Sequence, residues 1–417
     1  MHTRDFIRTV GASTIAALLG ENLWARYEPM PAAQLAQDEE FWTALRAKYR
    51  LKPDYINLEH GFYSIQSTEV LEAFIANVRE VNYQGSYYMR TVQAADKLAA
   101  RESLAAMAGC SPDELIITRN TTESLDTVIA GYDWKPGDEA VMAVQDYGAM
   151  LDQFALQAKR YGMVNRIVSL PNDPKSDDEL VQLYANAITP KTRLLLVSHL
   201  VNITGQLIPV RKIADMAHAK GVAVAGDGAH AFAQLDYRIP DLGVDYYAAS
   251  LHKWLGVPLG AGLLYVKRDR IADLWPMFGD MSFPATDIRK LNHTGTHPVH
   301  TDLAIKSAIA FHQSIGTPRM EARMRFLQQY WITKVRNVKN IVVNTPVDPT
   351  RSAGIANVGI VGMPPADLAK TLLDRYRIWT VAIDRENVRG TRITPHMYTM
   401  TRELDTLVRA LKELAAA

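Results

Sequence analysis

Short runs of apolar residues recur along the middle of the chain, from about residue 114 onward, and stretches of helical periodicity separate most of them. The predicted strands are Leu115–Thr118, Glu139–Val144, Asn165–Val168, Arg193–Ser198, Val222–Ala225, Tyr246–Ala249 and Gly262–Val266. Apolar strands that alternate with helices are typical of a mostly parallel sheet covered on both faces. The pattern therefore predicts an α/β fold built around such a sheet.

Helical periodicity also flanks this region on both sides. The predicted helices are Asp38–Tyr49, 67–83, 92–108, a long stretch from Asp302 to about Asn337, Pro365–Tyr376 and Thr401–Leu414. Short strands are expected at Tyr55–Leu58, Ile355–Val361 and Ile378–Ile383. The last elements predict a small α/β domain at the C-terminus. Gln84–Arg90 is expected to be an aromatic loop, whose Arg90 either reaches a substrate or is solvated.

Composition narrows the class of function. The chain has 417 residues, of which 48% are hydrophobic, and its formal net charge is +1. This balance allows a large core and gives no reason to expect nucleic acid as a partner. Cys110 is the single cysteine, which excludes a disulfide framework and a cysteine-based metal cluster.

The first residues allow two interpretations. Thr3-Arg4 precedes a small apolar run from Val10 to Gly20, an arrangement similar to a twin-arginine export signal whose first arginine is replaced by Thr3. The run is too short to span a bilayer, so no membrane span is expected. A degenerate signal would place the protein in the periplasm. An N-terminal amphipathic helix would leave it in the cytoplasm.

Two residues in the centre of the chain suggest a specific cofactor chemistry. Asp227 follows one predicted strand, and Lys253 follows the next within Ser250-Leu251-His252-Lys253. A lysine can form a Schiff base with the aldehyde of pyridoxal 5′-phosphate (PLP), and a carboxylate can keep the pyridine nitrogen protonated. Either residue alone reads as an ordinary surface charge. The pair, with His230 between them in sequence, favours PLP chemistry.

Asp227-Gly228-Ala229-His230 followed by Ser250-Leu251-His252-Lys253 resembles the signature of class V aminotransferases, and most closely the isopenicillin N epimerase-like group. The resemblance extends from about residue 50 to the C-terminus. It implies a fold type I PLP enzyme with a mostly parallel seven-stranded sheet between helices and a small C-terminal domain. The expected division is a signal or helix at 1–34, a segment at 35–65 packing on the small domain, a PLP-binding domain at 66–305, and a linking helix and small domain at 306–417.

The resemblance also implies a set of cofactor contacts. Asn120-Thr121-Thr122 follows a strand and opens a helix, a junction that can bind an anion through exposed N–H groups or can simply cap the helix. In class V aminotransferases this junction holds the PLP phosphate. The implied phosphate residues are Thr121, Thr122, Ser250 and His252; Tyr147 would stack on the ring, and Asn202 and His230 would contact the phenolic oxygen.

Three further roles follow from the same resemblance. Thr296, in Thr294-Gly295-Thr296, would reach the phosphate in a neighbouring subunit, which implies a homodimer with shared sites. Arg392 would bind the substrate α-carboxylate, with Arg389 as the alternative. The loop after Lys253, to Gly262, would let the lysine act as a proton shuttle.

The motifs leave the reaction open. The expected function is chemistry at the Cα of an amino acid, an amine or an amino-acid-containing natural product, by epimerisation, transamination or elimination. Cysteine desulfurases share the motifs but use a nucleophilic cysteine in the C-terminal half, whereas Cys110 precedes the phosphate motif. A catalytically silent PLP-binding protein remains a second hypothesis. A metal-dependent hydrolase built on His293, His297 and His300 is a third.

Overall fold

A computed structural model of the chain describes residues 25–279, 281–385 and 387–417. The export-signal interpretation falls on Thr3, Arg4 and the run from Val10 to Gly20. These residues lie outside the described part of the chain, so this interpretation stays a prediction. None of the helices that the structure describes is long and apolar enough to cross a membrane.

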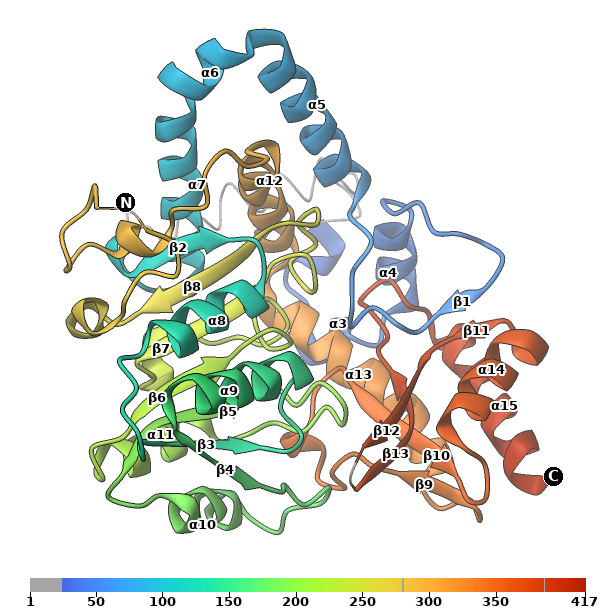
Figure 1. The fold of residues 1–417 in the computed structure, drawn as a ribbon. Coiled ribbons are helices and arrows are strands. Elements are labelled where there is room, and N and C mark those ends of the chain that lie inside the picture. The colour runs from blue at the N-terminus through green and yellow to red at the C-terminus, as the bar shows by residue number, and fades with distance from the viewer. Residues whose placement is uncertain (1–24, 280, 386) are drawn as a thin grey trace.

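A seven-stranded sheet forms the centre of the larger part of the molecule (Figure 1). In spatial order its strands are β2 (Leu115–Thr118), β8 (Gly262–Val266), β7 (Tyr246–Ser250), β6 (Ala223–Asp227), β5 (Thr192–Ser198), β3 (Glu139–Ala143) and β4 (Val164–Val168). β8 runs antiparallel to both of its neighbours, and the pairs from β7 to β4 are parallel. The predicted mostly parallel α/β sheet is confirmed.

The two faces of the sheet are covered because its strands are apolar on both sides. Within β5, Leu194 and Leu196 pack into one cluster of buried residues, and Leu195 and Val197 pack into another. This alternation follows the two-residue period of a strand. The first cluster includes side chains of α8 (Thr121–Gly131) and α9 (Gly148–Tyr161). The second includes side chains of α7 (Gln93–Ala108), α10 (Asp177–Ala187), α11 (Val210–His218) and α12 (His300–Ile315).

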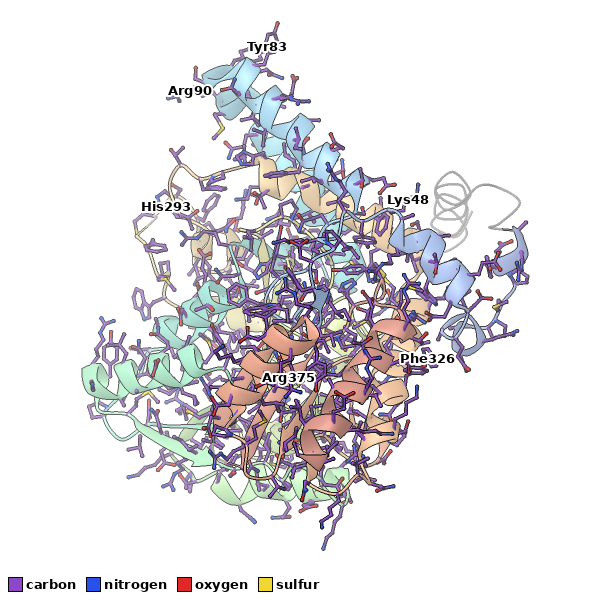
Figure 2. All side chains as sticks on the ribbon, turned by 90° about the vertical axis from the view of Figure 1, so that its right-hand side faces the viewer. Lys48, Tyr83, Arg90, His293, Phe326 and Arg375 are labelled. Carbon is purple, nitrogen blue, oxygen red and sulfur yellow. The ribbon has the colours of Figure 1, made fainter. Side chains whose placement is uncertain are left out.

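A helical arm projects from the body of the molecule (Figure 1). It consists of α5 (Thr68–Gln84), α6 (Ser86–Thr91) and the beginning of α7. The predicted aromatic loop at Gln84–Arg90 was wrong, because most of it forms α6 after a turn at Gly85. Figure 2 shows Tyr83 and Arg90 at the far end of this arm. Arg90 is exposed there and does not line the main cavity, in agreement with the solvated alternative.

The single long helical stretch predicted after Asp302 was also wrong. The structure has two helices, α12 (His300–Ile315) and α13 (Thr317–Val335). Gly316 separates them with a φ of 94°, a conformation that favours glycine, and Pro318 lies in the first turn of α13. α12 packs against α5 and α7, whereas α13 packs against α15 (Thr401–Ala416) and α3 (Ala32–Leu35).

A smaller four-stranded sheet carries the C-terminal region. Its order is β12 (Val381–Arg385), β13 (Val388–Ile393), β10 (Ala356–Ile360) and β9 (Ile341–Val343), all antiparallel, with α14 (Pro365–Tyr376) and α15 packed against it. The predicted strand Ile378–Ile383 is divided between β12 and β11 (Ile378–Trp379). β11 pairs instead with β1 (Ile56–Asn57), near α4 (Glu39–Arg46). Short 3-10 turns lie at Pro112–Glu114, Ile239–Leu242, Arg268–Asp273, Ile288–Leu291 and Pro349–Arg351.

The topology places several loops at one edge of the large sheet. β3, β5, β6 and β7 are parallel, so their carboxyl ends lie together, and β2 ends at the same edge because β8 is antiparallel to both β2 and β7. The small sheet reaches this edge through β13, whose following residue Thr394 forms an isolated bridge with Glu59. Side chains from distant parts of the chain therefore meet there.

Candidate active site

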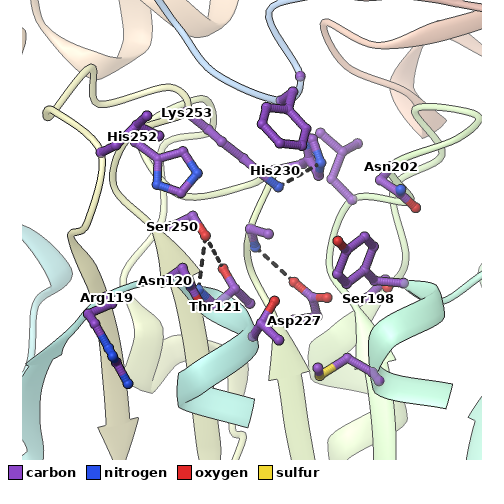
Figure 3. A pocket seen from close by; sticks show the side chains of 18 of the residues that line it. Arg119, Asn120, Thr121, Ser198, Asn202, Asp227, His230, Ser250, His252 and Lys253 are labelled. Atoms are coloured by element: carbon purple, nitrogen blue, oxygen red, sulfur yellow. Dashed lines mark hydrogen bonds between the residues drawn. The ribbon is translucent and has the colours of Figure 1, made fainter. Parts of the chain in front are cut away.

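A cavity of about 450 Å³ lies at this edge (Figure 3). Its lining includes ten of the predicted site residues, Thr121, Thr122, Tyr147, Asn202, Asp227, His230, Ser250, His252, Lys253 and Arg392, together with Gly61. Other lining residues are Phe62, Arg119, Asn120, Met150, Ser198, Leu200, Ala229, Leu259 and Gly260. The ends of five strands and the small sheet thus contribute to one site.

Lys253 follows β7 and extends into the cavity beside His230 (Figure 3). Its Nζ lies 3.1 Å from Nε2 of His230. Burial lowers the pKa of the Lys253 amine to about 8, although the nearby Asp227 carboxylate opposes this shift. Burial, reinforced by the charge of Lys253, also holds the pKa of His230 well below its usual range. A neutral imidazole therefore faces an amine that readily loses its proton.

Asp227 ends β6 and is buried at the floor of the cavity. Its Oδ1 accepts a hydrogen bond from the backbone N–H of Ala229 at 2.9 Å. Burial raises the pKa of the Asp227 carboxyl group, while this hydrogen bond and the positive charge of Lys253 oppose the shift. A cationic group bound against Asp227 would stabilise its ionised form for the same electrostatic reason.

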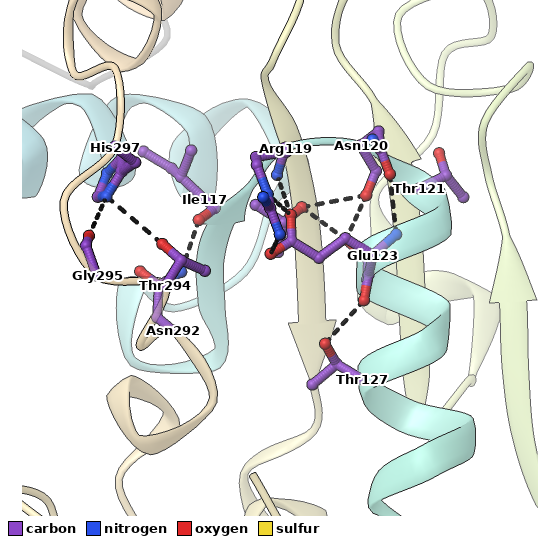
Figure 4. A network of polar contacts seen from close by, with 12 residues as sticks. Ile117, Arg119, Asn120, Thr121, Glu123, Thr127, Asn292, Thr294, Gly295 and His297 are labelled. Carbon is purple, nitrogen blue, oxygen red and sulfur yellow. Dashed lines mark hydrogen bonds and ion pairs between the residues drawn. The ribbon is translucent and has the colours of Figure 1, made fainter. Parts of the chain in front are cut away.

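The start of α8 and the end of β7 form a polar cradle (Figures 3 and 4). Asn120 caps α8 by accepting a hydrogen bond from the N–H of Glu123 at 2.9 Å. The Thr121 N–H donates to Oγ of Ser250 at 2.9 Å, and the two hydroxyl oxygens lie 2.7 Å apart. His252 Nδ1 is buried and has no hydrogen-bond partner among the described residues. Two hydroxyls, an imidazole and the positive end of an 11-residue helix suit a phosphate.

The loop after β3 places an aromatic ring and a buried carboxyl group side by side. Tyr147 lines the cavity with 47% of its surface exposed, so its ring is accessible to a flat ligand. The preceding residue, Asp146, is buried and accepts hydrogen bonds from Ser198 Oγ and the Ala143 N–H, both at 2.7 Å. Burial raises the pKa of Asp146 to about 7 despite these two bonds.

The two candidate arginines have different positions. Arg392 is buried at the cavity wall, where it forms an ion pair with Glu59 and donates from Nη1 to the Asn202 carbonyl at 3.2 Å. Arg389 is exposed on the same strand, β13, and pairs with Asp384 with an Nε–Oδ1 distance of 2.9 Å. It does not line the main cavity. The geometry therefore favours Arg392 over Arg389 as the arginine of the site.

Thr296 is the predicted site residue that the structure does not bring to this cavity. It is exposed, and it lies in the segment after Asn292 whose residues Thr294, Gly295 and His297 appear in Figure 4. Thr294 and His297 line a smaller cavity of about 110 Å³, which shares Arg119, Leu259 and Gly260 with the main one. The Thr296 side chain is therefore accessible to solvent.

The alternative hypothesis of a metal site on the histidines has no support in the described contacts. His297 Nδ1 lies 2.9 Å from the carbonyl of Gly295, and its Nε2 lies 3.3 Å from Lys97 Nζ and 3.6 Å from Asp302. The ring of His300 packs against Phe74. Within the described ranges, no three His, Cys, Asp or Glu side chains come together as a possible metal site.

The comparison with family models decides the class. A model for class-V aminotransferases matches residues 64–409. The chain belongs to this family. Among curated relatives, the isopenicillin N epimerase of Amycolatopsis lactamdurans is 30% identical over 393 residues, which cover 90% of this chain and 98% of that one. A cysteine desulfurase of Haloferax volcanii is 26% identical over 387 residues, covering 85% and 88% of the two chains.

Solved structures confirm the fold type I architecture expected of a class-V aminotransferase. The apo cysteine desulfurase of Thermococcus onnurineus NA1 superposes with a TM-score of 0.79 at 20% identity, covering 89% of this chain and 97% of that one. A C-DES mutant with glycine covalently linked to its PLP cofactor gives the same TM-score at 23% identity and covers 88% and 99%. Together with the family match, these findings identify a PLP-dependent enzyme.

The residues present in the cavity fit PLP. The Lys253 amine would face the aldehyde, and the buried Asp227 carboxylate would face the ring nitrogen. The accessible Tyr147 ring would cover the ring face, and the cradle at α8 would hold the phosphate. The unpartnered His252 Nδ1 lies in the same wall as the cradle, where a phosphate oxygen would satisfy it.

Sequence reasoning missed Glu59, Arg119 and Ser198. Arg119 immediately precedes the Asn120-Thr121-Thr122 motif, so extension of that motif by one residue finds it. Ser198 is the last residue of the predicted strand Arg193–Ser198, whose end lies at the same edge of the sheet as the other strand ends of the site. Glu59 stands in the turn of Gly61, but its ion pair spans 333 positions to Arg392. No local pattern indicates that pairing.

Proposed function

We propose that this class-V enzyme acts at the Cα of an amino acid, or of an amino-acid residue within a larger natural product, with PLP attached to Lys253. The observation that carries the proposal is that Lys253 and Asp227 line one cavity together with the cradle at α8. The reaction would begin with removal of a proton from Cα, which is compatible with epimerisation, transamination or elimination.

Lys253 is proposed as the group that takes and returns this proton. PLP, when bound, accepts the electron pair left at Cα, which makes the proton removable. The Lys253 amine has its pKa lowered to about 8, so it can hold or release a proton near neutral pH. The neutral His230, 3.1 Å away at Nε2, can accept a hydrogen bond from the protonated amine and orient it.

The other lining residues are proposed to hold the cofactor and the substrate. Asp227 would keep the ring nitrogen protonated, and Tyr147 would cover one ring face. Asn202 and His230 would contact the phenolic oxygen. Phosphate contacts are assigned to Thr121, Thr122, Ser250 and His252, and Arg392 would orient the substrate next to Cα.

A homodimer with shared sites is part of the proposal. Thr296 is exposed and close to a cavity adjoining the main one, a position suited to contact with a neighbouring subunit's phosphate. The helical arm supports an interface, because Tyr83 and Tyr87 expose 86% and 66% of their surfaces on it. Between α7 and the segment before His293 lies a surface hollow of about 640 Å³ that a second subunit could fill.

A cysteine desulfurase mechanism is disfavoured by the chemistry of the single cysteine. Cys110 follows α7 and does not line the cavity. Burial raises the pKa of its thiol to about 12, so the nucleophilic thiolate would be scarce at neutral pH. A catalytically silent PLP-binding protein is the remaining alternative, against which the intact pair of Lys253 and Asp227 argues.

The test is a spectral screen of the PLP-loaded protein against amines and amino acids. We expect a visible cofactor band that changes with at least one amine, with either an inverted Cα or an α-keto acid as product. The same band should be lost in Lys253→Ala. A band that no amine alters would favour the silent binding protein.

A further inference from the structure

The Arg392 guanidinium already binds a carboxylate of its own chain, that of Glu59. Its Nε donates to Oε2 of Glu59 at 3.2 Å, and its Nη2 donates to Oε1. Side-chain exposure is only 9% for Arg392 and 7% for Glu59. Two parallel hydrogen bonds in a buried setting make this a bidentate pair rather than a loose surface contact.

The surroundings hold Glu59 in this position. Thr394 Oγ1 lies 3.4 Å from Oε2 of Glu59, and the Glu59 N–H donates to Oδ1 of Asn57 at 2.9 Å. Gly61 packs directly on the guanidinium, since a Cβ at this residue would lie 3.0 Å from both Cζ and Nη2 of Arg392. Both side chains are therefore held by close neighbours, and neither can turn away at little cost.

The pairing changes what Arg392 can offer a substrate. A guanidinium has five N–H donors. Nε and Nη2 each donate one to Glu59, and Nη1 donates one to the Asn202 carbonyl. A substrate carboxylate could reach only the remaining N–H groups and would lie beside the Glu59 carboxylate, where like charges repel.

The positive charge of Arg392 is neutralised by Glu59, and Arg119, the other arginine in the described lining, does not supply a second one. It pairs with Glu123, with an Nε–Oε2 distance of 3.0 Å. Lys253 is assigned to the cofactor. A substrate group at Arg392 therefore meets hydrogen-bond donors without a net positive charge.

We propose that Glu59 is a specificity-determining residue that selects substrates whose carboxyl group at Arg392 is uncharged, as an amide or ester carbonyl. The substrate class would be an amino-acid residue with a free amine, joined through its carboxyl group to a larger molecule. This inference rests on the proposed function, and it departs from a simple carboxylate contact for Arg392.

The experiment uses PLP-loaded wild-type protein and pairs of ligands with the same side chain. Alanine, phenylalanine, serine and glutamate, each in both enantiomers, are compared with their primary amides. Binding is read from the absorbance change of the cofactor, not from turnover. We expect the amides that bind to do so at least about tenfold more tightly than the matched acids, because of the like-charge cost beside Glu59.

The variant Glu59→Gln keeps the size of the side chain and removes its charge. We expect it to shift the preference by about tenfold or more toward the free acids. The matched control is Asp384→Asn, which removes the carboxylate partner of Arg389 on the outer part of the same strand. The ratio of amide affinity to acid affinity in Asp384→Asn should equal that of the wild type.

The wild-type ratio needs no variant, so the inference remains testable if Glu59→Gln does not fold. Tighter binding of acids by the wild type, a ratio unchanged in Glu59→Gln, or no response to any amide would overturn it. Borohydride reduction followed by peptide mass spectrometry distinguishes failure of the proposed function from failure of the proposed role of Glu59. Absence of cofactor on Lys253 contradicts the proposed function, whereas cofactor on Lys253 with a preference for acids contradicts only the role of Glu59.

Discussion

The hydroxyl oxygens of Thr121 and Ser250 lie 2.7 Å apart, although 129 residues separate them in the chain. Thr121 opens α8 and Ser250 ends β7, so their contact joins a helix N-terminus to the strand that precedes Lys253. The proposed phosphate site and the lysine are therefore held in one rigid unit. This contact leads to the first prediction.

Ser250→Ala removes the acceptor for the Thr121 N–H and one hydroxyl of the cradle. We expect PLP affinity to fall at least about tenfold, because a hydrogen bond to a charged group contributes about 1.5–3 kcal/mol. Titration of the apoprotein with PLP measures this. Ser103→Ala is the control, since the Ser103 hydroxyl donates to the Ala99 carbonyl within α7, outside the cavity. Equal affinities for both variants would argue against the cradle.

The amine of Lys253 should determine how the apoprotein takes up PLP at different pH values. Its pKa is lowered to about 8 from the usual 10.5, and the neutral amine is the nucleophile. The rate constant for attachment should rise from pH 6 and level off above pH 9, with a midpoint near 8. Stopped-flow absorbance can follow it, with a lysine peptide measured in parallel. A rate that continues to rise to pH 10, as for the peptide, would contradict the lowered pKa.

Asp146 should make the stability of the apoprotein depend on pH. Its folded-state pKa is raised to about 7 from 3.8, so the folded chain binds more protons than the unfolded chain between these values. The resulting stabilisation is complete below about pH 4 and is lost as the pH rises toward 7. Asp146→Asn mimics the protonated form. Its stability relative to the wild type should increase over this window by at most about 1.4 kcal/mol per pH unit.

Urea unfolding of both apoproteins at several pH values measures that difference. The free energy of unfolding of Asp146→Asn minus that of the wild type should rise between pH 4 and pH 7 and stay constant above pH 7. A difference that stays constant from pH 4 to pH 8 would show that the Asp146 carboxyl titrates normally.

Thr296 provides a test of the shared site. Thr296→Ala should lower PLP affinity about tenfold, by loss of one hydrogen bond to phosphate from a neighbouring subunit. In mixed dimers of Thr296→Ala and Lys253→Ala chains, one cavity would combine an intact Lys253 with an intact Thr296 from the other chain. These dimers should regain one cavity of wild-type affinity per dimer. Failure to regain it, or a monomer in sedimentation experiments, would rule out the shared site.

Much of the architecture follows from local sequence patterns. Strands such as Leu115–Thr118 and Gly262–Val266 are short apolar runs, and they coincide with the predicted ranges. Helix boundaries were less predictable where backbone geometry decides them. Gly316 divides the stretch after Asp302, and the aromatic residues after Gly85 form α6 because helical hydrogen bonds continue there.

The residues of the site were predictable where their motifs lie at the ends of strands. Asp227 and Ser250 end buried strands and Lys253 follows one, and parallel strands bring such ends to one edge. The pairing of Glu59 with Arg392 was not predictable, because it depends on how β1 and the small sheet pack together across 333 residues.

The most direct measurement is an electron-density map from crystals of the PLP-loaded protein. Density continuous from Nζ of Lys253 into the cofactor is expected, with the ring nitrogen within hydrogen-bond distance of Asp227 and the phosphate at Thr121. Cofactor bound elsewhere, or in this cavity with its ring nitrogen turned away from Asp227 and no link to Lys253, would contradict the account.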